Sequence, residues 1–150
     1  MMNISLEISS KSLCKHGEEL CGDTVEIIKT ENSDIIILSD GMGSGVKANI
    51  LSTLTGRILG TMLKQGARIE DCVDTIAKTL PVCSVRKVAY STFSILQIFD
   101  NGDAYLVEYD NPGCVMIHNK KLVDIPYTTK EIEGKSIREY RFKVSMNDYF

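Results

Sequence analysis

The beginning of the chain carries the apolar pattern of β-strands. Residues 3–9 place isoleucine or leucine at every second position, which is the alternation of a half-buried strand. Two further apolar stretches, 25–29 and 34–38, flank a polar turn at residues 31–33. We therefore expect the chain to open with three strands, of which the second and third form a hairpin.

Further along, the apolar residues follow a helical period. The predicted apolar face has members at four-residue spacing and their neighbours: Val46, Ile50, Leu54, Ile58 and Met62, widened by Leu51, Leu59 and Leu63. This pattern predicts an amphipathic helix that ends at Gly66. A second amphipathic helix is expected over residues 69–80, because two acidic residues suit its N-terminus and Pro81 ends it.

The second half of the chain returns to the β pattern. Strands are expected over residues 90–99, 104–109, 114–118, 122–125 and 137–144, with a polar loop over residues 127–135. Strands, a helical pair and then successive strands predict an α+β fold, a sandwich of two antiparallel sheets flanked by helices. Residues 1–150 are interpreted as a single domain. The chain ends just after a turn at residues 146–148, so we expect this domain to be incomplete at its C-terminus.

Composition and charge narrow the range of partners. The net charge is −3, and the basic residues are scattered, which disfavours nucleic acid as a partner. The longest apolar run, residues 35–38, is far shorter than the roughly 20 residues needed to cross a membrane, and no signal peptide is evident. We therefore expect a cytoplasmic protein with no membrane partner.

The five cysteines form no CxxC pair, which argues against a disulfide framework and against a zinc site. Cys14 and Cys21 enclose His16 and could in principle bind a metal together, but their spacing disfavours this. For most of the five, a buried thiol that acts as a small apolar side chain is the preferred interpretation.

A glycine-rich segment over residues 40–45, Asp-Gly-Met-Gly-Ser-Gly, lies between a predicted strand and a predicted helix. One interpretation is a loop that cradles a nucleotide phosphate. Its spacing is G-x-G-x-G instead of G-x-G-x-x-G, and it lacks the lysine–serine pair of a P-loop. Asp40, directly before the first glycine, would also repel a pyrophosphate. We therefore disfavour nucleotide binding.

The favoured interpretation makes Asp40 a metal ligand at the end of a buried strand. The backbone carbonyl of Gly41 can supply a second hard oxygen ligand, of the kind that Mg²⁺ or Mn²⁺ prefers. Asp23, which leads into the strand before it, can supply another carboxylate. The alternative is a pair of ordinary turn aspartates whose side chains bond to the local backbone.

Several motifs together resemble a known family. They are Gly22-Asp23, Leu38-Ser39-Asp40-Gly41-Met42-Gly43-Ser44-Gly45 with Ala48, Tyr90-Ser91-Thr92-Phe93-Ser94, and Tyr109-Asp110-Asn111-Pro112-Gly113. The chain resembles the stage II sporulation protein E-type branch of the metal-dependent protein serine/threonine phosphatases. The resemblance extends from about residue 10 to the end, and the Asp-Gly-Met-Gly-Ser-Gly segment is its most specific part.

This resemblance implies a sandwich of two sheets flanked by helices, with a centre of two Mn²⁺ or Mg²⁺ ions at one edge. It implies that Asp40 bridges both ions, that Gly41 contributes its carbonyl, and that Asp23 supports the site directly or through water. The implied reaction is hydrolysis of phosphoserine or phosphothreonine by a metal-bridging hydroxide. Phosphorylated regulatory proteins, above all anti-sigma-factor antagonists, are the implied substrates. A cysteine phosphatase is disfavoured.

The chain also departs from the family pattern. The remaining metal-binding aspartates of the family would follow Phe150, and Asp148 matches only a connecting turn. Met42 stands where other branches of the family have a histidine. We expect His16 and His118 to be exposed residues without a catalytic role.

Two further features of the family pattern concern the helical region. Ser44 is interpreted as a helix N-cap. The helical pair can move in sporulation-type relatives, and the same is a hypothesis here. The rival function is a non-catalytic module of the same fold that serves in protein binding or homodimerisation.

Overall fold

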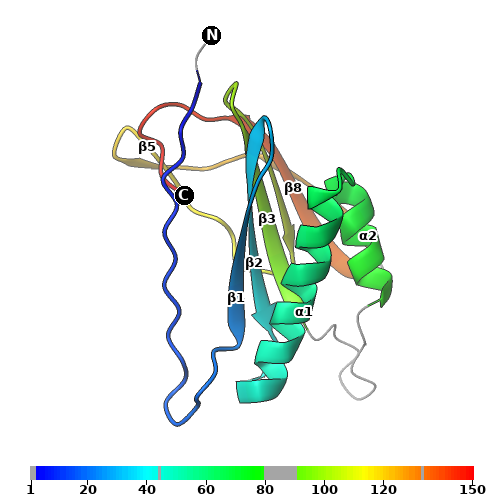
Figure 1. The fold of residues 1–150 in the computed structure, drawn as a ribbon. Helices are drawn as coiled ribbons and strands as arrows, with labels where there is room; N and C mark the ends of the chain where they lie inside the picture. The colour runs from blue at the N-terminus through cyan, green and yellow to red at the C-terminus, as the bar shows by residue number, and fades with distance from the viewer. Residues whose placement is uncertain (1–2, 44, 80–90, 133) are drawn as a thin grey trace.

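The computed structural model of this protein describes residues 3–43, 45–79, 91–132 and 134–150. The strands are β1 Asp23–Lys29, β2 Ser33–Gly41, β3 Ser91–Phe99, β4 Asp103–Tyr109, β5 Met116–His118, β6 Lys121–Val123, β7 Tyr127–Ile132 and β8 Lys135–Lys143. The helices are α1 Gly45–Lys64 and α2 Ile69–Thr79. Within the described residues, six strands form one antiparallel sheet in the order β1-β2-β3-β4-β8-β7, and β5 and β6 form a separate pair (Figure 1).

Both described helices cover the same face of the six-stranded sheet (Figure 1). The core between these layers contains side chains from both helices and from five of the six strands. At its centre the rings of Phe93 and Tyr109 stack with their centroids 5.0 Å apart. The predicted α+β class with antiparallel sheets is therefore confirmed.

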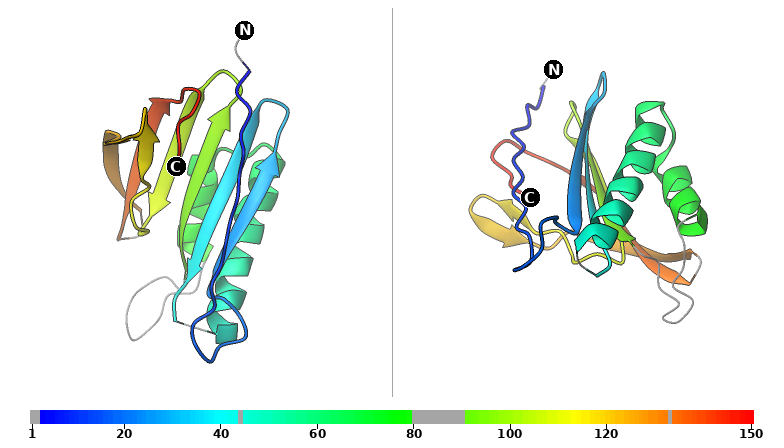
Figure 2. Two further views of the ribbon diagram at one scale, coloured as in Figure 1. Left: turned by 90° about the vertical axis from the view of Figure 1, so that its left-hand side faces the viewer. Right: turned by 60° about the horizontal axis from the view of Figure 1, so that its bottom comes forward.

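A second apolar cluster lies on the opposite face of the sheet. It is built from β3, β4 and β8 and is joined by Ile4 and Leu6 from the N-terminal segment. This segment runs along the face away from the helices, on the same side of the sheet as the β5–β6 pair (Figure 2). The sheet thus has a helical layer on one side and a thinner, less regular layer on the other.

The strand predicted over residues 3–9 is wrong, because this segment has no regular secondary structure. The alternation of apolar and polar residues does correspond to burial, since Ile4 and Leu6 pack on the sheet. Its backbone is held at one end by the Ile4 N–H, which donates to the carbonyl of Asp100. Alternating side chains bury one face of an extended segment whether or not a neighbouring strand completes a ladder.

The loop predicted over residues 127–135 is also wrong. Residues 127–132 form β7, an edge strand that pairs with β8 along its whole length. Its side chains are almost all exposed, so an apolar pattern is missing from the sequence. Cross-strand contacts supply the order instead, including the ring of Tyr127 against that of Tyr140.

Helix α1 packs on the sheet through a face that overlaps only in part with the predicted one. Leu59 and Leu63 of the predicted face are buried, and Ile58 and Met62 pack against the core, but the N-terminal half differs. Val46, Ile50 and Leu54 are 62%, 57% and 46% exposed. The buried face consists mainly of small residues: Gly45, Ala48, Ser52, Thr55, Gly56, Leu59, Gly60 and Leu63. A Cβ atom at Gly60 would lie 3.2 Å from Cδ1 of Ile28, so the small residues let the helix approach the sheet closely.

The predicted end of α1 at Gly66 is confirmed. Gly66 has a φ of +87°, a left-handed conformation that suits glycine. The N–H of Ala67 donates to the carbonyl of Met62, and the N–H of Gly66 donates to that of Leu63, which is the Schellman pattern of helix termination.

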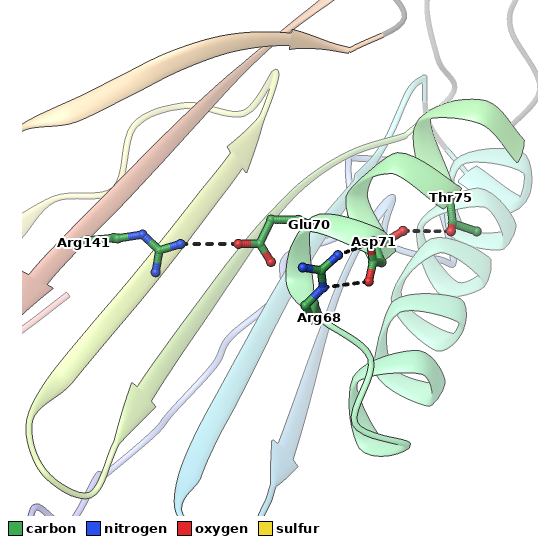
Figure 3. A network of polar contacts seen from close by, with 5 residues as sticks. All are labelled: Arg68, Glu70, Asp71, Thr75 and Arg141. Carbon is green, nitrogen blue, oxygen red and sulfur yellow. Dashed lines mark hydrogen bonds and ion pairs between the residues drawn. The ribbon is translucent and has the colours of Figure 1, made fainter.

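Helix α2 begins at Ile69 as predicted, while Leu80 and Pro81, its expected end, lie outside the described residues. Arg68 forms two hydrogen bonds with the carboxylate of Asp71 at this N-terminus (Figure 3). Glu70 accepts a hydrogen bond from Arg141 of β8, whose guanidinium lies over the ring of Tyr105. These contacts link the start of α2 to the sheet.

Candidate metal centre

Asp23 and Asp40 face each other across neighbouring strands. Asp23 is the first residue of β1, Asp40 is the second-last residue of β2, and the antiparallel register pairs them directly. Directly opposed residues have Cβ atoms about 5 Å apart, with side chains on the same face. The two carboxylates therefore lie on one face at one end of the sheet. It is the face away from the helices, because Asp40 alternates along β2 with Ile35 and Ile37, which belong to the core beneath the helices. The end of β2 lies near the start of α1 (Figure 1).

The proximity of the two carboxylates affects Asp40. Partial burial raises the pKa of Asp40, and a hydrogen bond with Asp23 and the negative charge of Asp23 raise it further. Neither aspartate forms an ion pair with a basic residue in the part of the chain that the structure describes. Two facing carboxylates suit a bound cation, because their oxygen atoms are hard ligands.

Packing against α1 requires glycine at position 41. A Cβ atom at this position would lie 2.0 Å from the carbonyl oxygen of Ala48 in α1, so only glycine fits beneath the helix. The Gly41 N–H donates to the carbonyl of Gly22, at 2.9 Å. This hydrogen bond holds Gly22 beside Gly41, while a Gly41 carbonyl ligand stays a prediction.

Two hydroxyl-bearing residues and an amide continue the site onto β3. Thr92 is the register partner of Asp40 on the other side of β2. Its hydroxyl donates to Oδ1 of Asn111 at 2.7 Å, and the Asn111 amide donates to the hydroxyl of Ser94 at 3.0 Å. The motifs that contain these residues were recognised in the sequence, but their mutual contacts depend on register and could not be read from it.

Glu108 was missed by the sequence analysis. Its side chain is almost fully buried and accepts hydrogen bonds from the hydroxyl of Tyr140 at 2.8 Å and from the backbone N–H of Cys114. Arg138 forms an ion pair with Glu108 and also donates to the carbonyl of Asn111 at 2.7 Å. The sequence offered one signal for Glu108: it is the single acidic residue within the apolar strand predicted over residues 104–109. This network holds the turn that carries Asn111.

The two histidines lie outside this group. No hydrogen bond or ion pair from His16 to the two aspartates is found among the described residues. His118 is half-buried, and its Nδ1 lies 2.5 Å from the carboxylate of Asp148. The expectation that His118 is merely exposed is therefore wrong: it pairs with Asp148 where residues 117 and 149 bridge. Asp148 has this local role and also accepts a hydrogen bond from the Ser145 N–H.

The donor set fits a hard divalent cation only in part. Asp23 and Asp40 offer carboxylate oxygens, as such an ion requires. The described part of the chain brings together no group of three or more histidine, cysteine, aspartate or glutamate side chains able to hold a metal ion. The expected Asp23–Asp40 pair therefore offers only part of a ligand set, and its binding of a metal ion stays a prediction.

No protein-family model and no curated protein matches this sequence. Solved structures do match. The PP2C phosphatase domain of SpoIIE from Bacillus subtilis, determined with a fragment of its regulatory domain, superposes with a TM-score of 0.78 at 18% identity over 92% of this chain. The chain has the fold of a PP2C phosphatase domain. The fold expected from the motif resemblance is thereby confirmed.

Two other solved structures share this fold. RsbX in complex with magnesium gives a TM-score of 0.68 at 17% identity over 92% of this chain and 68% of the RsbX chain. The RsbU and RsbW domains of Rv1364c from Mycobacterium tuberculosis give 0.69 at 14% identity over 91% of this chain. This chain spans 42% of the SpoIIE structure and 40% of the Rv1364c structure.

No helix in the described residues is both long and apolar enough to cross a membrane.

Proposed function

We propose that this chain is part of a metal-dependent protein serine/threonine phosphatase of the SpoIIE type. The observation that carries the proposal is the direct pairing of Asp23 with Asp40 at the end of the sheet. The PP2C fold and the magnesium named with RsbX support a divalent cation at such a site. Mn²⁺ and Mg²⁺ are both candidates.

Each residue of the pair has a proposed role. Asp40 and Asp23 would hold the cation between them, and the Gly41 carbonyl would complete this side of its coordination. A bound divalent ion lowers the pKa of a water ligand and neutralises phosphoryl oxygens. Thr92 and Asn111 keep the neighbouring strand and turn fixed beside the carboxylates through their hydrogen bond.

The proposed substrate is phosphoserine on a small regulatory protein such as an anti-sigma-factor antagonist. The sequence resemblance implies this substrate class. Its support from the solved structures is indirect: the same fold occurs in the cell fate determinant SpoIIE and in the protein with RsbU and RsbW domains. A cytoplasmic location and a homodimer are further proposals.

A second candidate is a non-catalytic module of the same fold that binds another protein. The incomplete metal-ligand set among the described residues favours it. So do Ile27 and Leu38, which are 44% and 42% exposed on the sheet face that carries Asp40. Apolar side chains at that level of exposure suit a covering partner.

Hydrolysis of para-nitrophenyl phosphate and of a phosphoserine peptide, with and without Mn²⁺, tests the phosphatase proposal. The assay uses this chain and a chain extended through roughly 60 further residues of its gene, enough for two or three more elements. We expect Mn²⁺-dependent hydrolysis by the extended chain, lost in Asp40→Asn and kept in Asp34→Asn, a matched control on the same strand whose partner is Lys29. An Asp40→Asn variant as active as its parent would refute the site. A folded, inactive extended chain would favour the binding module.

A further inference from the structure

Cys14 and Cys21 lie in the loop that precedes Asp23, and their sulfur atoms are 2.6 Å apart. Both are free thiols; Cys14 is exposed and Cys21 is half-buried, so the pair is accessible to small reagents. The spacing of cysteines in the sequence argued against a role for them as a pair. The fold of the loop brings them together.

The loop between the two cysteines is attached to the helix that begins next to the candidate metal centre. The side-chain amide of Asn49 in α1 donates to the carbonyl of Cys21 at 2.9 Å. Glu18, between the cysteines, places its carboxylate against Gly45, where a Cβ atom would lie 2.5 Å from Oε2. A carboxylate at a helix N-terminus is electrostatically favourable. The loop is therefore docked on α1 at both of these points.

The same loop leads directly to the backbone that positions Asp23. Gly22 follows Cys21 and accepts the hydrogen bond of the Gly41 N–H. Because Gly22 directly follows Cys21, a shift of Cys21 would move Gly22 relative to Gly41. It would also move Asp23, the first residue of β1. A covalent bond between the cysteines would restrict this loop.

We propose that Cys14 and Cys21 are a reversible thiol–disulfide site that holds Gly22 against Gly41. The oxidant is a low-molecular-weight disulfide. The thiolate of Cys14 attacks one sulfur of that reagent, releases its first thiol and forms a mixed disulfide; Cys21 then attacks the Cys14 sulfur and releases the second thiol. The two cysteines are oxidised, the reagent is reduced to two thiols, and the two cysteine protons end on those thiols. The site needs no metal and is independent of the proposed phosphatase function.

The first test is the covalent bond itself. The chain is incubated with oxidised or with reduced glutathione, alkylated under denaturing conditions and digested with trypsin. Because Lys15 separates the two cysteines, oxidation should link the tryptic peptides 12–15 and 16–29. The link should be absent in Cys14→Ser and retained in Cys114→Ser, a control whose cysteine lies outside the loop. Glutathione attached to either cysteine without the link, or a link to another cysteine, would overturn the proposal.

The second test measures the position of the loop. Amide hydrogen exchange of the Gly41 N–H, followed by NMR in metal-free protein, should slow severalfold after oxidation of the parent chain and return to its original rate after reduction. The Cys14→Ser chain treated with oxidised glutathione should show no change. Formation of the disulfide without slower exchange at Gly41 would refute the effect on the Gly22–Gly41 contact.

Discussion

At the scale of single residues, the feature that matters most is a pair of like charges placed face to face. Directly opposed carboxylates on neighbouring strands destabilise a sheet. Asp23 and Asp40 nevertheless occupy this position, and partial burial together with Asp23 raises the pKa of Asp40. This arrangement costs stability in the free chain and offers oxygen ligands, which supports the proposal that the pair binds a cation.

Replacing Asp40 by asparagine should stabilise the metal-free chain slightly at pH 7, because it removes one of the two charges. An exposed like-charge pair costs about 0.5 kcal/mol, equivalent to a rise of about 1–2 °C in Tm for a domain of this size. A carboxyl whose pKa is raised by folding costs stability once it ionises, so the cost is present above the raised pKa and absent below the ordinary value of about 3.9. The advantage of the variant should shrink as thermal unfolding is repeated from pH 7 toward pH 4. An advantage independent of pH would contradict the assignment.

Gly41 is expected to tolerate no side chain. The Gly41→Ala methyl would collide with the Ala48 carbonyl and push α1 from the sheet, which should lower the free energy of unfolding by about 3 kcal/mol. Gly43→Ala is the control. Gly43 has a φ of +97°, and apart from its chain neighbours no described atom lies within 4 Å of the place where a methyl group would lie, so we expect a cost of about 1–2 kcal/mol from backbone strain. Urea denaturation measures both. A loss in Gly41→Ala no larger than in Gly43→Ala would show that α1 is not in close contact there.

At the scale of elements, periodicity predicted the existence of helices and strands better than it predicted their faces. The β1–β2 hairpin, α1 and the start of α2 follow from local pattern and turn chemistry. The buried face of α1 could not be read from hydrophobicity, because close approach to the sheet selects small residues such as Gly56 and Gly60. The edge strand β7 was missed for a related reason: its order comes from pairing with β8 and not from an apolar face.

The two faces of α1 should respond differently to substitution. Ile50→Ser changes a side chain that is 57% exposed, and we expect its effect on the free energy of unfolding to stay within about 0.5 kcal/mol. Gly60→Val places atoms against Ile28 and should cost about 1–3 kcal/mol. Chemical denaturation of both variants distinguishes the observed face from the predicted one, and a larger loss in Ile50→Ser would favour the predicted face.

At the scale of the whole molecule, the sheet carries the core and brings the two aspartates together. The hairpin pattern and the family resemblance together predicted Asp23, Asp40 and Gly41 as one site, since this part of the strand order is local in sequence. The contacts of Thr92 with Asn111 and of Glu108 with Arg138 needed the three-dimensional register. The solved structures show that the chain shares the fold of PP2C phosphatase domains, and the partial ligand set among the described residues defines what must be measured.

The central claim is that Asp23 and Asp40 together bind a divalent cation. Isothermal titration of the 150-residue chain with Mn²⁺ tests it most directly, with Asp23→Asn, Asp40→Asn and Asp34→Asn as variants. We predict a dissociation constant of about 10⁻⁴–10⁻³ M, in the range of weak oxygen-ligand sites, for the parent chain and for Asp34→Asn. Either of the other two substitutions should weaken binding at least about tenfold. Equal Mn²⁺ affinity in the parent and Asp40→Asn would contradict the claim.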